Sequence, residues 1–167
     1  MQDLVLALGL AICLITDLRE RKIYNLVLFP VLLFGIIFNL FTGGLQGFLH
    51  SLYGLLVGMG ILILPFALGG IGAGDVKLLG AIGAVKGPMF VLYAALGMGL
   101  AGGLIALIIL TLQGRLLKSI KSLLRGLWLM LITRFKVIKF EFDNEKTMLP
   151  YGLAIVIGAI GAYWWMG

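Results

Sequence analysis

The chain has 167 residues, of which 62% are hydrophobic and only 12% are charged, and its mean hydropathy is +1.15. Soluble domains carry about 25% charged residues, so this composition excludes a soluble enzyme or binding module and indicates an integral membrane protein. The net charge of +6 could suggest nucleic acid binding. The basic residues stand beside apolar runs, however, which predicts a membrane topology and no nucleic acid partner.

Six apolar runs are expected to cross the membrane, since a spanning helix needs about 20 largely apolar residues. The first run has no basic segment before it and no small-residue cleavage site, which is typical of a retained helix rather than a signal peptide. The sequence therefore predicts an all-α, polytopic membrane helix bundle of about six transmembrane helices, forming a single membrane-embedded domain over residues 1–167. The expected spans are residues 4–16, 23–41, 48–68, 76–85, 89–112 and 149–166.

The first apolar run contains the only cysteine, Cys13, and is followed directly by Asp17. A single cysteine excludes an intrachain disulfide and a cysteine-based zinc site, and we interpret Cys13 as a core residue. The helix from Asp3 to Asp17 would be about 21 Å long, against a hydrocarbon core of about 30 Å. Because the helix is expected to continue past Asp17, this carboxylate is predicted to lie below the membrane surface.

The second and third runs are separated by residues 42–44, a Thr-Gly-Gly turn sequence. His50, the only histidine, stands at the start of the third run. A lone histidine is a poor metal site, so we interpret it as structural or interfacial and predict no metal and no cofactor. Glycines four residues apart, at 54 and 58 and at 99 and 103, favour close helix packing in lipid.

A glycine-rich break over residues 69–74 runs directly into Asp75 between two apolar runs. An ionised aspartate at membrane depth is energetically costly and usually marks a functional site. Gly72 and Gly74 have no side chains, so the backbone here can leave helical geometry and admit a substrate strand. Lys77 follows two residues later, where it could orient a partner or extend toward the lipid headgroups, and both interpretations stay open.

Lys and Arg are distributed unequally along the chain. Placing the amino terminus outside puts twelve of the thirteen basic residues on the inner side and leaves only Lys86 outside. This asymmetry predicts that both termini are outside and that Asp17 and Asp75 lie in the cytosolic half of the membrane. Residues 113–147 form the expected cytosolic loop, and its first part has the apolar spacing of an amphipathic helix lying on the membrane.

Two carboxyl groups at the same depth can hydrolyse a peptide bond. One must be ionised to take a proton from water, and the other must be protonated to polarise the scissile carbonyl. Two close carboxyl groups provide both forms, because ionising the first makes the second harder to ionise. Asp17 and Asp75 are therefore predicted to be the catalytic dyad of a membrane aspartic protease.

Three motifs, in the right order, resemble those of the type IV prepilin peptidases. The glycine break ends in the Gly-x-Gly-Asp pattern of that family, and the segment after Asp17 is similar to that of its first catalytic aspartate. A third motif before the last span matches the family's final helix. The residues that carry the resemblance are Gly72, Ala73, Gly74 and Asp75, then Asp17, Arg19, Ile23 and Asn25, and lastly Leu149, Pro150, Tyr151 and Gly152.

The resemblance implies an aspartic endopeptidase that uses two aspartates, Asp17 and Asp75. It would cleave the basic leader from type IV prepilin-like proteins at the cytosolic face of the inner (plasma) membrane. The implied partners are the prepilin-like substrate and the lipid bilayer, and the oligomeric state stays open. The implied supporting residues are Gly72, Gly74, Lys77, Asn25, Pro150, Tyr151 and Gly152.

Two departures from the family pattern are visible. The family often has Ile-Pro-Asn where this chain has Ile23-Tyr24-Asn25. Its larger members carry an amino-terminal extension with paired cysteines that is associated with methylation of the new amino terminus. This chain starts at the first catalytic helix, so it resembles a short, peptidase-only member, similar to those that serve tight-adherence pili or archaeal preflagellins, and no N-methyltransferase activity is expected.

Two other classes of protein share some of these features. A presenilin-like or signal-peptide-peptidase-like protease also has Gly-x-Gly-Asp, but it normally has Tyr-Asp where this chain has Thr16-Asp17, and it has more spans. A small proton-coupled transporter also carries intramembrane acids. Inverted repeats, which are common in transporters, are not evident here, and both acids lie on one side of the membrane rather than at its midplane.

Overall fold

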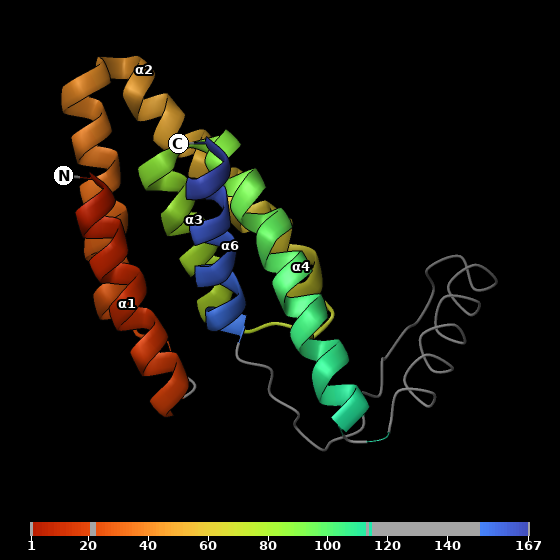
Figure 1. Ribbon diagram of the computed structural model, residues 1–167. Coiled ribbons are helices and arrows are strands. Elements are labelled where there is room, and N and C mark those ends of the chain that lie inside the picture. The colour runs from red at the N-terminus through yellow and green to blue at the C-terminus, as the bar shows by residue number, and fades with distance from the viewer. Residues whose placement is uncertain (1, 21–22, 113, 115–150, 167) are drawn as a thin grey trace. The chain divides into compact units, whose positions relative to one another are not determined.

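The computed structural model describes residues 2–20, 23–112, 114 and 151–166. These residues form helices and no strand, which confirms the predicted all-α class. The expected loop and amphipathic helix of residues 113–147 lie outside the described residues, Gly114 excepted. The helices are α1 (Gln2–Glu20), α2 (Asn25–Ala67), α3 (Ala73–Lys86), α4 (Pro88–Leu112) and α6 (Tyr151–Met166) (Figure 1).

Helix α2 is 43 residues long and is bent at Gly44, which has φ 58° and ψ −142°. Only glycine adopts this conformation without strain. The bend divides α2 into two arms, residues 25–43 and 45–67, which fold back against each other (Figure 1). Ser51 in the second arm donates a hydrogen bond to the Gly35 carbonyl in the first at 3.5 Å. The predicted turn at residues 42–44 is present, but the two expected spans on either side of it are arms of one helix.

Two of the described helices are long and apolar enough to cross a membrane, namely α2 and the Pro88–Ile109 part of α4. Helix α1 carries several charges, α3 has only 14 residues and α6 has 16. By length and composition alone, these three do not qualify as spans. The expected total of about six spans therefore stays a prediction.

Glycines bring the second arm of α2 into backbone contact with α3. A Cβ added to Gly54 would lie 2.9 Å from the Gly87 Cα, and one added to Gly58 would lie 3.0 Å from the Gly80 Cα. The close packing predicted from the spacing of these two glycines is confirmed. A Cβ on Gly99 or Gly103 would meet no described atom within 4 Å, so close packing at this pair stays a prediction.

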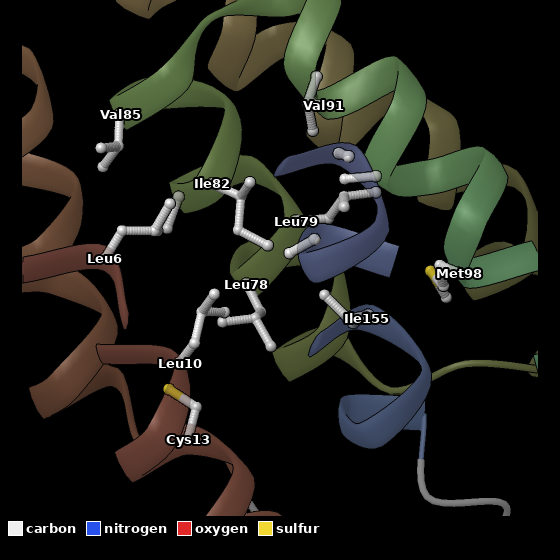
Figure 2. Close-up of a cluster of buried hydrophobic side chains, with 14 of the residues drawn as sticks. Leu6, Leu10, Cys13, Leu78, Leu79, Ile82, Val85, Val91, Met98 and Ile155 are labelled. Atoms are coloured by element: carbon white, nitrogen blue, oxygen red, sulfur yellow. The ribbon is translucent and has the colours of Figure 1, made fainter. Parts of the chain in front are cut away.

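Helix α3 lies at the centre of the hydrophobic core, with almost every residue from Val76 to Val85 buried. Leu6, Leu10 and Cys13 of α1 contribute side chains to this core, and Cys13 is only 2% exposed. Figure 2 shows side chains from α1, α3, α4 and α6 in this cluster. The predicted core position of Cys13 is confirmed.

The described helices belong to two compact units. Helices α1, α2, α3, α6 and the part of α4 up to Ala101 form the first unit, and the rest of α4 belongs to the second. Within the second unit, the Thr111 hydroxyl donates to the carbonyls of Leu107 and Ile108. The pocket described next lies entirely in the first unit.

The charged side chains described in the first unit gather at two ends of the helices. At one end, called the Asp3 end, Asp3 of α1 forms an ion pair with Lys86 of α3. At the other, called the Asp17 end, the last turn of α1 meets the first turn of α3. Helices α1 and α3 are therefore antiparallel, and the described residues between these ends include no Asp, Glu, Lys or Arg.

Candidate active site

A pocket of about 400 Å³ at the Asp17 end brings the two predicted aspartates together. Asp17 comes from α1 and Asp75 from α3, and 58 residues separate them in the sequence. The two carboxyl groups are close enough to act on each other electrostatically. The residues that line the pocket are Asp17, Ile23, Tyr24, Asn25, Gly72, Ala73, Gly74 and Asp75.

Asp75 is the third residue of the α3 helix, and only 8% of it is exposed. Gly72 precedes the helix in an extended conformation, and its N–H donates to Asp75 Oδ2 at 3.3 Å. A carboxylate in the first turn also interacts favourably with the positive end of the helix dipole. The local sequence therefore positions Asp75 by letting it cap the start of its own helix.

Asp17 is half-buried in the last turn of α1 and packs against α6. A Cβ added to Gly152 would lie 2.9 Å from the Asp17 Cγ, so no larger residue fits there without moving the carboxylate. Helix α1 continues to Glu20, as the sequence predicted. Gly152 is thus a direct neighbour of Asp17 although it stands 135 positions later in the chain.

The segment from Ile23 to Asn25 covers the start of α3. A Cβ added to Gly74 would lie 3.0 Å from the Ile23 Cβ, so the absence of a side chain at Gly74 allows this close contact. The Lys77 ammonium donates to Asn25 Oδ1 at 3.1 Å. Lys77 is therefore close to the pocket without lining it.

The remaining predicted site residues lie on α6 or just before it. Tyr151 is half-buried, packs against the core, and lies within electrostatic reach of Asp75. Gly152 contacts Asp17 as described, and Pro150 lies outside the described residues. The structure thus brings eight of the nine predicted positions to one end of the first unit, which are Asp17, Asn25, Gly72, Gly74, Asp75, Lys77, Tyr151 and Gly152.

Tyr24 is a pocket residue that was not predicted from the sequence. Tyr24 lines the pocket, and its hydroxyl donates a hydrogen bond to Glu20 in the last turn of α1. It occupies the position where the family often has proline. This difference from the family pattern is the sequence feature that could have pointed to Tyr24. The hydrogen bond ties the start of α2 to the end of α1.

Other candidate sites among the described residues have few side chains that could react or bind a metal ion. A pocket of about 480 Å³ between α2 and α4 is lined by apolar residues and by Tyr93. The described residues include no group of three or more His, Cys, Asp or Glu side chains that could hold a metal ion. His50 packs against Gly87, where an added Cβ would lie 2.6 Å from the His50 Cδ2, and this contact fits its structural interpretation.

Comparison with known proteins identifies the family of this chain. The model of the type IV leader peptidase family matches residues 4–107, which is more than half of the chain and includes both aspartates. No curated protein and no solved structure was found to match. The chain therefore belongs to the type IV leader peptidase family. Membership indicates a peptidase and implies a prepilin-like substrate, and the two long apolar helices are consistent with a membrane protein.

Proposed function

We propose that this protein is a membrane aspartic endopeptidase that removes the basic leader from type IV prepilin-like proteins, with Asp17 and Asp75 as its catalytic dyad. The observation that carries the proposal is the shared pocket, because two acids far apart in the sequence meet there on separate helices. Both acids are also within the residues that match the family. No cofactor enters the proposed reaction.

In this mechanism, one aspartate is ionised and takes a proton from water, whose oxygen attacks the scissile carbonyl carbon. The other aspartate is protonated and donates its proton to the carbonyl oxygen. The carbon–nitrogen bond then breaks. A hydroxyl of the intermediate gives its proton to the ionised aspartate, and the protonated aspartate gives its proton to the leaving nitrogen. The pair ends with one proton, as it began, and that proton belongs to both groups together.

The proposed location of the reaction is the cytosolic face of the inner membrane. In this proposal about six helices cross the bilayer, both termini are outside, and the Asp17 end faces the cytosol. The separation of charges into two ends supports this arrangement, since charged groups avoid the hydrocarbon region. The excess of Lys and Arg in the expected inner segments supports the orientation.

The proposed substrate is a protein with a short basic leader followed by an apolar helix, cut at their junction. A pocket at a charged end of an otherwise apolar helix bundle suits this junction, because the leader would be in water and the helix in lipid. Asp17, Glu20 and Asp75 put negative charge at this end, next to the positive charge of Arg19 and Lys77.

The test is a cleavage assay with candidate prepilins co-expressed with the wild-type protein or its variants. Asp17→Asn and Asp75→Asn should each abolish cleavage, because Asn keeps the shape but cannot exchange the proton. The double variant should be no worse than either single variant, since residues that act as one unit fail together. Glu20→Gln, the matched control on α1, should keep most activity. Substantial cleavage by either Asn variant, at normal membrane levels, would remove the assignment.

A further inference from the structure

The contact between Lys77 and Asn25 sets the direction of the Asn25 amide group. The Lys77 Nζ lies 3.1 Å from Asn25 Oδ1, and these residues belong to different helices. An ammonium group has three hydrogen-bond donors and no acceptor. The amide oxygen must therefore face Lys77, because the amide nitrogen could offer it only another donor.

The amide nitrogen of Asn25 is left on the side away from Lys77. Asn25 lines the pocket that holds Asp17 and Asp75, whereas Lys77 is not among its lining residues. Since Lys77 binds the amide oxygen, the two N–H groups are the part of the Asn25 amide that is left to donate to a group in the pocket. An ionised carboxylate only accepts hydrogen bonds, so these donors add a function that the ionised member of the dyad lacks.

We propose that Asn25 is a catalytic residue whose amide N–H groups donate to the scissile carbonyl oxygen, and that Lys77 is a positioning residue that holds this amide in place. The proposal rests on the proposed function of the pocket. A fixed donor aimed at an oxygen that gains negative charge stabilises the transition state more than the bound substrate. Its removal should therefore lower kcat and change KM little.

The backbone around Asn25 is anchored independently of Lys77. Ile23 packs against Gly74 of α3, and the Tyr24 hydroxyl donates to Glu20 of α1. Loss of the Lys77 ammonium leaves both of these contacts in place. A Lys77 variant should consequently fold normally and free only the amide to rotate.

The experiment measures kcat and KM for cleavage of one purified candidate prepilin by the full-length protein in detergent. The key variant is Asn25→Asp, which keeps an oxygen facing Lys77 but replaces the N–H donors with a second oxygen. The adjacent ammonium partly neutralises the added charge, and Asn25→Ala removes the donors without any charge. The matched control is Arg19→Met, which removes an exposed cation from the same end of the unit.

Both Asn25 variants should lower kcat about 10- to 100-fold, within the range for loss of a transition-state donor, with KM changed less than about threefold. Lys77→Met should lower kcat about 3- to 10-fold. Lys77→Arg should keep kcat close to the wild-type value, because Arg can also donate a hydrogen bond to the Asn25 amide oxygen. Arg19→Met should match the wild type. The double variant Lys77→Met with Asn25→Ala should be no slower than Asn25→Ala alone, since Lys77 acts through Asn25.

Full kcat in Asn25→Asp would overturn the proposal, because it would mean that holding Lys77, not donating, is the role of Asn25. A raised KM with unchanged kcat would also overturn it, as would a double variant whose losses multiply. These results can be distinguished from a failure of the proposed function. If the proposed function is wrong, the Asp17→Asn and Asp75→Asn variants will still cleave the substrate.

Discussion

Lys86 at the end of α3 forms an ion pair with Asp3 at the start of α1, at the end of the first unit opposite the pocket. The Lys86 ammonium also lies over the Tyr163 ring of α6, 4.4 Å from its centroid, and the Tyr163 hydroxyl donates to Asp3. Phe90 of α4 packs edge-on against Tyr163, with ring centroids 5.1 Å apart. The same two helices, α1 and α3, carry Asp17 and Asp75 at their other ends, so this cluster helps to set their register.

Loss of the ion pair should therefore destabilise the fold without removing a reacting group. Asp3→Asn and Lys86→Met should each lower the midpoint of thermal unfolding. Their coupling in a double-mutant cycle should be about 0.5–1 kcal/mol, since Asp3 is largely exposed and such pairs contribute little. Both variants should still cleave the substrate at temperatures well below their unfolding midpoints. Strictly additive effects on unfolding would contradict the proposed link.

The contact between Gly152 and Asp17 predicts that a single added methyl group impairs the site. In Gly152→Ala, the new Cβ would displace the Asp17 carboxylate, and a displacement of about 1 Å can cost up to about 100-fold in rate. We expect kcat/KM to fall at least about tenfold. The matched control on the same helix is Gly161→Ala, where an added Cβ would meet no described atom within 4 Å. Equal activity in the two variants would contradict this prediction.

Asn39 should be important for stability rather than for catalysis. Its amide nitrogen donates to Ser51 Oγ at 2.7 Å and to the carbonyl oxygens of Ala84 and Val85 at the end of α3. Asn39→Leu would leave these acceptors without that donor, which should cost about 1–3 kcal/mol of unfolding free energy.

The matched control for Asn39 is Thr42→Ala. The Thr42 hydroxyl is exposed and donates only to the Phe38 carbonyl of its own helix turn, so its removal should be nearly neutral. Both variants are compared by thermal unfolding in the same detergent. Equal midpoints would show that the Asn39 hydrogen bonds add nothing to stability.

The proposed topology predicts which positions react with a membrane-impermeant thiol reagent. In a Cys13→Ala background, Gly43→Cys should be labelled from outside, because an added Cβ at Gly43 has open space and lies beside the α2 bend. Gly70→Cys should be labelled only after the membrane is opened, because it lies near the pocket end. Strong outside labelling at Gly70 would contradict the orientation.

The amino-acid pattern alone was sufficient for the all-α class, the family, the turn near Gly44 and the close approach of Gly54 and Gly58 to another helix. These features depend on local chemistry: long apolar runs, residues without side chains, and short motifs. The proposed dyad also came from local signals, because an aspartate beside an apolar run is conspicuous wherever it occurs.

Contacts between distant helices could not be derived in this way. In a chain where nearly every helix face is apolar, hydrophobic periodicity does not tell which face is buried. The rotation of each helix, and hence its contacts, follows from packing against its neighbours. For this reason two contacts became visible only in the folded arrangement. They are the packing of Gly152 against Asp17 and the hydrogen bond between Lys77 and Asn25.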